Sequence, residues 1–303
     1  MSREQQELPD APHPTLPHDG GRRLWEARRR GANALMWAGA VLATLAALIP
    51  LVMVLYYIAA QGLPALNPAF FTHLPKPVGE PGGGMGNAIV GTLVLIALAS
   101  AAGLPIGILG GIYLAEFGGN RFGAAIRFAA DVLAGVPSIV IGILVWVIVV
   151  APMHTFSALA GGAALGMMMI PTVIRTTEEL VRLVPVSQRE AALSLGATRW
   201  RTIFKVVLLA AKGGVITGVL LAIARIAGET APLIMTALGN SSWSARLDRP
   251  IASLPVQIYR YATGPWDEWH AQAWAAALIL VVMILILSVA ARYATGGRFR
   301  GVR

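Results

Sequence analysis

The chain has 303 residues, of which 56% are hydrophobic and only 13% are charged, and its formal net charge at pH 7 is +9. About a quarter of the residues of a soluble domain are charged, so this composition indicates an integral membrane protein. The absence of cysteine excludes disulfides, thiolate metal sites and cysteine nucleophiles. The basic residues gather at the ends of apolar segments, which indicates contact with membrane lipids and argues against nucleic acid as a partner.

Residues 1–33 are polar and rich in proline, and they end in a basic cluster that includes Arg28, Arg29 and Arg30. We expect a disordered tail with a basic membrane anchor. The start of the chain lacks the charged, apolar and cleavage regions of a secretion signal, so we expect no removable signal peptide.

Apolar stretches long enough to cross a bilayer follow the tail, since a crossing helix needs about 20 residues. Five clear ones lie at residues 34–60, 87–115, 128–151, 213–238 and 271–291. A sixth, at 157–176, is shorter and contains Pro171. The prediction is therefore six spans, with kinks or breaks expected at Pro105, Pro137 and Pro171.

The distribution of Lys and Arg predicts the orientation. With the N-terminus inside, the inner segments hold 19 of the 24 basic residues and the outer segments hold 4, while Arg225 lies within a span. Basic residues prefer cytoplasmic segments. Both termini and the segment at 187–201 are thus expected in the cytoplasm.

The segment at 187–201 forms a polar island between two apolar segments. Ser187 and Glu190 have the spacing of a capping box, and Gly196 offers the left-handed residue that ends a helix after about two turns. Ala191 and Ala192 present a small face to a partner. Because so short a helix is marginal alone, we expect a docking helix, with an ordinary linker helix as the alternative.

Arg225 and Glu229 are spaced one helical turn apart within the fifth predicted span. Placing an arginine at mid-membrane costs about 2.5–3.5 kcal/mol, whereas a helical Arg–Glu pair returns only about 0.2–0.5 kcal/mol in water. The pair therefore does not serve stability, and we expect both side chains to face an aqueous path through the membrane. Arginine donors match the oxygens of a tetrahedral oxyanion. Glu229 would hold the guanidinium of Arg225 in place between passing anions, or repel an anion that lingers; an interhelical salt bridge is the alternative.

A second charged cluster closes the fourth span, where Arg175 precedes Glu178 and Glu179 at helical spacing and Arg182 follows. The cluster is predicted either to gate a path near the docking segment or to anchor the helix at the membrane boundary. Asp131, at the start of the third span, has the same two interpretations, of which anchoring is favoured.

Glycines recur every four residues, as in Gly103, Gly107 and Gly111, and predict close packing of helices. The histidines show no paired ligand spacing, so no metal site is expected. No phosphate-binding loop and no catalytic triad occur, which predicts a non-catalytic chain.

From about residue 84 onward the chain resembles the permease subunits of phosphate-specific ABC importers, and among them the PstA branch. The resemblance rests on residues 87–92 (Asn-Ala-Ile-Val-Gly-Thr), 131–142, 174–179, 228–233, 252–259 and 268–274. Glu190-Ala-Ala, followed by Gly196, resembles the EAA loop with which such permeases dock to their ATPase. Val206, Leu208 and Leu209 stand where that loop usually has Ile-x-Leu-Pro, so the proline is missing.

The resemblance implies an all-α membrane protein with the type I importer (MetI-like) fold and six transmembrane helices. The expected parts are a tail (1–33), a first helix (34–60), a periplasmic loop (61–86), a permease core (87–293) with a coupling loop (177–212), and a cytoplasmic tail (294–303). Residues Arg175, Glu178, Arg225 and Glu229 are assigned to the phosphate path, and Glu190, Ala191, Ala192 and Gly196 to ATPase coupling.

The resemblance also implies partners and a location. They are a PstC-like permease that completes a heterodimer, two copies of an ATPase that bind ATP and Mg, and an external phosphate-binding protein, in the bacterial inner membrane. This chain itself is expected to bind no cofactor.

Two alternatives remain open. An ion-coupled secondary transporter or channel would use Arg225 and Glu229 as a relay, although it would need no docking loop. A permease for a related oxyanion would have the same features, because residue chemistry alone does not separate phosphate from its analogues. A scaffold without transport would leave Arg225 without a purpose.

Overall fold

The computed structural model describes residues 19–77, 80, 82–244 and 246–296. These residues form helices joined by loops, and within them the β-structure is limited to one isolated bridge between Leu238 and Ile251. The chain divides into two compact units, Met1–Tyr57 and Ile58–Arg303.

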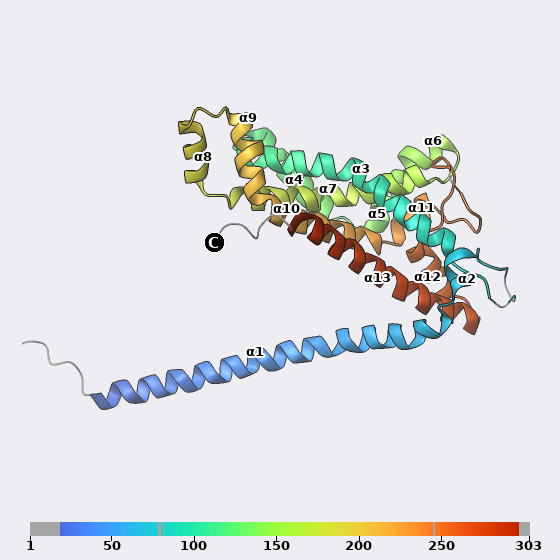
Figure 1. The fold of residues 1–303 in the computed structure, drawn as a ribbon, viewed down its shortest axis with the longest axis horizontal. Coiled ribbons are helices and arrows are strands. Elements are labelled where there is room, and N and C mark those ends of the chain that lie inside the picture. Colours follow the sequence, from blue (N-terminus) through green and yellow to red (C-terminus); the bar gives the residue numbers. More distant parts are fainter. Residues whose placement is uncertain (1–18, 78–79, 81, 245, 297–303) are drawn as a thin grey trace, which may run out of the picture. The chain divides into compact units, whose positions relative to one another are not determined.

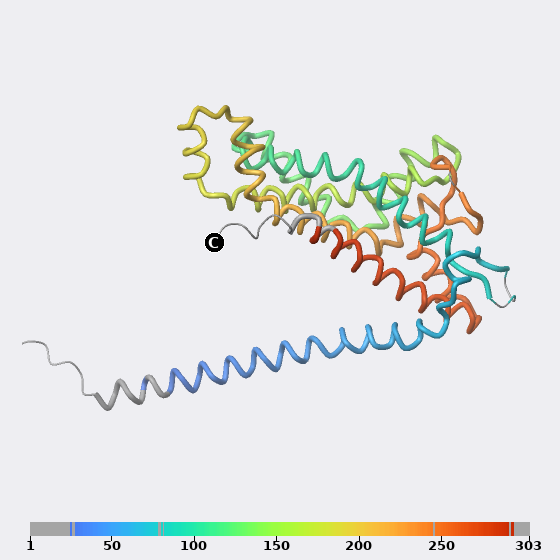
Figure 2. Tube along the Cα trace, in the orientation of Figure 1, coloured from blue at the N-terminus to red at the C-terminus, as the bar shows by residue number. Residues whose placement is uncertain are grey.

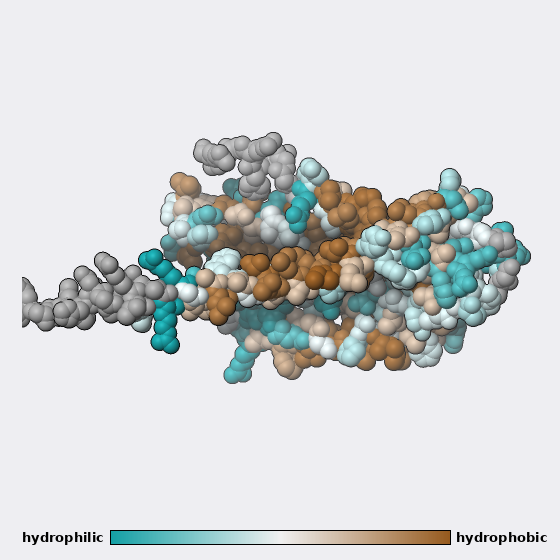
Figure 3. Space-filling model, turned by 90° about the horizontal axis from the view of Figure 1, so that it is seen from below, coloured by the Kyte–Doolittle hydropathy of each residue, from teal (hydrophilic) through white to brown (hydrophobic). Residues whose placement is uncertain are grey.

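The first unit holds most of helix α1 (Asp19–Gly62), whose middle is covered by hydrophobic side chains (Figure 3). The predicted disordered tail corresponds only in part to this unit. Residues 1–18 lie outside the described residues, and residues 19–33 form the first turns of α1 instead. The physical reason is composition, because after Pro17 the next proline is Pro50, and Leu, Ala, Glu and Arg favour a helix.

The second unit contains the remaining helices (Figure 1). The long ones are α3 (Gly86–Phe117), α4 (Arg121–Gly135), α7 (Ala158–Arg182), α10 (Leu208–Ala227) and α13 (Asp267–Gly296). The short ones are η1 (Leu63–Ala65), α2 (Pro68–Thr72), α5 (Ser138–Val145), α6 (Ala151–Met153), α8 (Val186–Ser194), α9 (Arg199–Thr202), α11 (Ala231–Thr236) and α12 (Leu254–Ala262). Two π-helical segments, η2 (Trp146–Val150) and η3 (Ile203–Val207), continue α5 into α6 and α9 into α10.

The number of membrane spans agrees with the prediction of six. Five helical segments of the described chain are long and apolar enough to cross a membrane, and a sixth span results if α4 and the α5–α6 segment are counted as one bent pair. The bend of 106° falls at Pro137, where the ring of proline pushes the preceding residue out of the helical region. Pro105 and Pro171, in contrast, lie inside continuous helices.

The fifth span differs from its predicted bounds of 213–238. It covers Arg199–Ala227 and ends at Gly228, after which the short helix α11 begins. Pro232 lies in the first turn of α11, where proline favours the start of a new helix and does not continue an old one. The prediction treated α10 and α11 as one span because both helices are apolar, and hydropathy does not show the break between them.

The glycine repeats form a close seam between α3 and α7. A Cβ atom added at Gly107 would lie 2.6 Å from the Cβ of Val173, and one at Gly111 would lie 2.5 Å from the Cβ of Thr177. Glycine is thus required for this approach, as predicted for small residues at that spacing. Gly214 and Gly218 of α10 meet Leu180 and Thr176 of α7 in the same way. The repeats join helices of this chain.

The two ends of the second unit carry different elements. Helices α8 and α9 lie at one end, and α2, α6, α11 and α12 lie toward the opposite one (Figure 1). The trace in Figure 2 leaves α7, turns through α8 and α9, and returns as α10. The coupling loop predicted at 177–212 therefore comprises the end of α7, α8, α9, η3 and the start of α10.

A buried set of neutral polar residues, here called the polar junction, ties together the end opposite α8. Asn87 donates from Nδ2 to the carbonyl of Asn240 at 2.7 Å, and the Leu254 amide donates to Oγ1 of Thr92 at 2.8 Å. Ser253 is also buried there. Two segments 162 residues apart in sequence are thus locked side by side.

Candidate functional site

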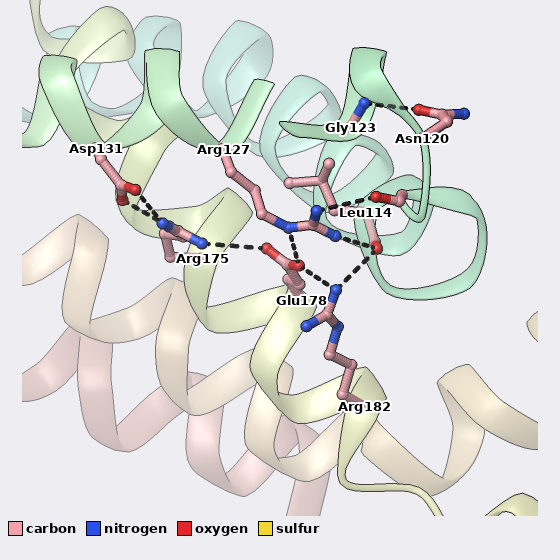
Figure 4. A network of polar contacts seen from close by, with 9 residues as sticks. Leu114, Asn120, Gly123, Arg127, Asp131, Arg175, Glu178 and Arg182 are labelled. Carbon is pink, nitrogen blue, oxygen red and sulfur yellow. Dashed lines mark hydrogen bonds and ion pairs between the residues drawn. The ribbon is translucent and has the colours of Figure 1, made fainter. Parts of the chain in front are cut away.

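Five charged side chains gather between α4 and α7 and are here called the arginine cluster: Arg127, Asp131, Arg175, Glu178 and Arg182 (Figure 4). Glu178 lies at its centre. Its Oε1 accepts from Nε of Arg127 at 2.7 Å and pairs with Nη2 of Arg182 at 2.8 Å, and its Oε2 pairs with Nη1 of Arg175 at 3.5 Å. Arg175 also forms a two-pronged pair with Asp131, whose Oδ1 accepts from Nε at 2.8 Å.

Local helix geometry brings these residues together. Arg127 and Asp131 lie one turn apart on α4, and Arg175, Glu178 and Arg182 lie on successive turns of α7, so each helix presents its charges on one face. The side chain of Asn120 caps the start of α4 through the amide of Gly123 at 2.8 Å. The cap and the bend at Pro137 define the two ends of α4.

The burial of the arginine cluster is uneven. Glu178 is only 3% exposed, whereas Arg182 and Asp131 are more than half exposed. A buried carboxylate is stable only when it is paired and hydrogen-bonded, and three guanidinium groups meet this need. Three cations and two anions leave the cluster with one formal positive charge, which suits an anion at its exposed edge.

Arg127 also satisfies the end of α3. It donates from Nη1 to the Gly118 carbonyl at 2.9 Å and from Nη2 to the Leu114 carbonyl at 3.0 Å. Arg182 reaches the same Leu114 carbonyl at 3.4 Å. The last carbonyls of a helix have no partner within it and attract cations. The arginine cluster therefore joins α3, α4 and α7.

Arg225 and Glu229 do not form the helical pair that their spacing predicted. Arg225 lies in the last turn of α10, whereas Glu229 follows the helix end at Gly228. Among the described residues no ion pair joins them. The prediction was wrong because it assumed an unbroken helix from 213 to 238.

Arg225 instead belongs to an exposed stripe on α10. Gly213, Thr217, Leu221 and Arg225 recur every four residues and are all exposed, while Ala222 and Ile226 pack into the core. Leu221 is 66% exposed. This face of α10 is therefore largely uncovered by the rest of the second unit.

Arg225 and the arginine cluster lie at different levels of the helix bundle. Gly218 of α10 meets Thr176 of α7, next to Arg175, and Gly214 meets Leu180, so the two helices run in opposite directions. Arg225 is seven residues beyond Gly218, or roughly 10 Å along the axis. The predicted path residues thus form two separate groups, Arg225 in one and Arg175 with Glu178 in the other.

Helix α8 contains the predicted docking residues. The predicted capping box is absent, because the helix begins at Val186 after Pro185 and no side chain caps it. Ser187 lies within the first turn, two positions past the cap position at Pro185, so its hydroxyl does not serve the amide that a cap would serve. Pro185 has a non-helical backbone conformation, so the helix begins at the next residue, Val186.

The predicted end of α8 is confirmed at Gly196, whose φ is +79°. The Gly196 amide donates to Leu193 at 2.9 Å and the Ala197 amide donates to Ala192 at 3.1 Å, which is the bond pattern of the Schellman motif. Glu190 and Ala191 are exposed and Ala192 is partly exposed, and Leu195 just beyond the helix is 89% exposed. The segment thus presents both small and apolar side chains outward.

The position of the missing proline, Leu209, lies in the first turn of α10, two residues after the π-helical segment η3 (Ile203–Val207). A π segment adds one residue to a helical turn and is often found at functional positions.

Residues 107–296 match the model of a protein family described as the inner membrane component of binding-protein-dependent transport systems. The phosphate transport system permease protein PstA of Yersinia pestis is 45% identical over 272 residues, which cover 89% of this chain and 92% of that protein. The chain belongs to the PstA family of transport permeases.

The PstA family assignment extends beyond bacteria. A probable phosphate transport system permease protein PstA of Methanocaldococcus jannaschii is 39% identical, over 83% of this chain and 89% of that protein. A bacterial alginate ABC transporter, solved with its alginate-bound periplasmic protein, has a similar fold with a TM-score of 0.63. At 16% identity over 90% of this chain and 97% of that one, the likeness concerns the fold alone.

Some residues of this PstA-family chain were missed or undervalued by the sequence analysis. Arg127 was counted only as a cytoplasmic charge and Asp131 was interpreted as an anchor, although both meet the charged residues of α7. Their spacing of four residues on an amphipathic segment was the available signal. Glu116 and Arg189, which also form an ion pair, gave no such signal. Within the described part of the chain, no three His, Asp or Glu side chains gather as a metal site.

Proposed function

We propose that this chain is the permease subunit of an ATP-driven importer of inorganic phosphate, and that it forms the translocation path together with a second, PstC-like permease. The names of its relatives supply the substrate. The structural observation that best supports the proposal is Arg225, an exposed arginine on a membrane-spanning helix. Arg225 lies in the last turn of α10, not at the middle of a span as the predicted bounds of 213–238 implied. An arginine side chain still avoids lipid, so we propose that this face of α10 borders a polar path between two permeases.

Arg225 is proposed to bind the phosphate oxyanion within the path, because its guanidinium stays charged and offers paired donors. Arg175 and Glu178 of the arginine cluster are proposed to line the path nearer the α8 end. Glu229, which lies at the break between α10 and α11, would adjust the field around the anion without pairing to Arg225.

The α8 segment is proposed to dock to a separate ATPase dimer, which would bind ATP and Mg, while this chain binds no cofactor. Glu190, Ala191 and Ala192 would touch the ATPase, and Gly196 would keep the turn after α8. Exposure of these side chains supports the assignment. An external phosphate-binding protein would deliver the substrate at the end opposite α8.

The proposed orientation places the α8 end and both termini in the cytoplasm. The α8 end carries Arg182, Arg189, Arg199, Arg201 and Lys205, and basic residues favour the cytoplasmic side. The end with α12 would then face the outside of the bacterial inner membrane.

The deciding experiment is uptake of radiolabelled phosphate by vesicles that contain the co-expressed complex. We expect ATP-dependent uptake by the wild type and its loss in Arg225→Gln, with the complex still assembled. Arg121→Gln, which removes the same charge from an exposed position at the start of α4 and outside the coupling loop, should retain uptake.

Three results would contradict this proposal. Uptake by Arg225→Gln at the wild-type rate would remove Arg225 from the path. Uptake driven by an ion gradient without ATP would favour a secondary transporter. Stronger transport of arsenate or sulfate than of phosphate in competition would favour a permease for a related oxyanion.

Docking is tested separately with Glu190→Lys, which reverses a charge on the exposed face of α8. We expect the variant to insert in the membrane and to lose its ATPase on co-purification. Glu80→Lys, the same change in an exposed loop at the other end of the second unit, serves as the control and should keep the ATPase. An ATPase that stays bound to Glu190→Lys would refute the docking role.

A further inference from the structure

Arg189 lies next to Glu190 in α8 but points back toward the transmembrane helices. It donates to Oε1 of Glu116 from Nε at 3.2 Å and from Nη2 at 3.0 Å. Nη2 also donates to the Val181 carbonyl at 2.8 Å, and Nη1 donates to the Val184 carbonyl. One guanidinium thus binds the last turn of α3 and the end of α7 at once.

This contact is the principal attachment of α8 to those helices. No residue of α8 is buried; Arg189 and Ala192 are partly buried, and its other residues are exposed. The side chain of Arg189 is 18% exposed and that of Glu116 is 14% exposed. A charged pair so shielded from water is stronger than an exposed one, and Arg189 adds bonds to carbonyls at and just beyond the end of α7.

The attachment lies close to the arginine cluster. Glu116 is two residues from Leu114, whose carbonyl accepts from both Arg127 and Arg182. Val181 precedes Arg182 in α7. A displacement of Arg189 therefore acts on the two helix ends that hold Glu178 and its arginines in place.

We propose that Arg189 and Glu116 are positioning residues that link the docking helix to the arginine cluster, so that movement of α8 repositions α3 and α7 together. The inference rests on the proposed function, because it assigns α8 to ATPase docking. Arg189 faces the other helices of this chain and Glu190 faces outward. The two neighbouring residues therefore have different roles: Arg189 transmits the movement within the chain, and Glu190 contacts the ATPase. Lysine does not replace Arg189, since it lacks the planar set of donors that reaches three oxygen acceptors.

The first test measures phosphate transported per ATP hydrolysed by the complex with Arg189→Gln in reconstituted vesicles. We expect the ATPase to remain bound and active, while the ratio falls about tenfold or more, since loss of a charge-assisted bond corresponds to at least about one factor of ten. Glu116→Gln should cause a similar fall, and the double variant should be no worse than either single one, as expected for one shared interaction. Arg189→Lys should lie between wild type and Arg189→Gln.

The matched control is Arg121→Gln, which removes an exposed charge at the start of α4, outside the coupling loop, and should leave the ratio unchanged. A wild-type ratio in Arg189→Gln would overturn the proposal. Loss of the ATPase from Arg189→Gln would also overturn it, because Arg189 would then be a docking residue. Additive losses in the double variant would show that the two residues act separately and would likewise refute the link.

A second measurement is independent of phosphate. Because the chain has no cysteine, spin labels can be placed at Ser194→Cys, at the end of α8, and at Gly119→Cys, where an added Cβ meets no atom within 4 Å. In the otherwise wild-type complex we expect a narrow distribution of distances between the two labels, both with and without ATP. When Arg189→Gln is added to the labelled protein, we expect this distribution to become broad. Equal widths with and without Arg189→Gln would refute the link even if phosphate is not the substrate, whereas failure of wild-type phosphate uptake alone would refute only the proposed function.

Discussion

The polar junction contacts the start of α3 and the arginine cluster contacts its end, yet the two are built from different chemistry. The polar junction uses neutral hydrogen bonds to backbone groups, with Asn87 and Thr92 both nearly inaccessible to water. The arginine cluster uses charged pairs, some of them more than half exposed. A buried backbone amide that loses its acceptor pays the full cost of desolvation, whereas an exposed charge exchanges its partner for water at little cost.

The difference indicates one fixed end and one adaptable end. At the polar junction Oδ1 of Asn87 and Oγ of Ser253 are already buried without a partner. Separating Thr92 from Leu254 would leave a buried amide unsatisfied as well, so these two segments are held in one arrangement. Around Glu178 the carboxylate has three alternative donors, so the surrounding helices can shift while the charge stays paired. An importer that changes conformation at its ATPase-facing end would use this property there.

The largest effect is expected for Glu178→Gln, which removes the central anion of the arginine cluster. Breaking a buried ion pair from one side costs about 3–5 kcal/mol, because three guanidinium groups are left without their carboxylate. We expect a clear fall in the melting temperature of the purified complex and loss of uptake. Glu179→Gln, its exposed neighbour on α7, should change neither, and an unchanged melting temperature in Glu178→Gln would mean that the arginines find other partners.

A smaller effect is expected for Thr92→Val in the polar junction. Valine keeps the shape but leaves the buried Leu254 amide without an acceptor, at a cost of about 1–3 kcal/mol. The melting temperature should fall, while uptake per folded complex stays at the wild-type level because this end is not rearranged. Thr217→Val removes a similar bond to the preceding turn at an exposed position and should leave the melting temperature unchanged. A fall in uptake without a fall in stability would contradict a fixed end.

The smallest effect is expected for Arg246→Gln, in the exposed loop that follows α11. Arg246 donates to Asp248 and lowers the pKa of that carboxyl below its ordinary value. Such a pair stabilises the fold above the ordinary pKa of aspartate, and the contribution disappears as the pH falls through the lowered pKa. Both groups are exposed, so we expect no resolvable change in the melting temperature between wild type and variant at neutral pH or in acid. A measurable difference at neutral pH would show that the loop is more constrained than its exposure indicates.

Predictions from local patterns agreed well with the structure. The six spans, the close glycine seam and the left-handed end of α8 at Gly196 each follow from residues near one another in sequence, where hydropathy, side-chain size and backbone freedom act directly. The wrong predictions also arose locally. Ser187 was assigned a cap that Pro185 had displaced, and Glu229 was assigned to a helix that ends at Ala227, because one-dimensional patterns do not show which of two competing signals prevails.

The sequence by itself determined that this is a membrane protein, how many spans it has, and through its motifs the family to which it belongs. Only the tertiary structure decided which charges meet. Arg127 and Glu178 are 51 residues apart, and Glu116 and Arg189 are 73 apart, so their pairing depends on how α3, α4, α7 and α8 pack. The physical reason is that hydropathy, charge and propensity are properties of each segment, whereas the partner of a buried ion is a property of the packed helices.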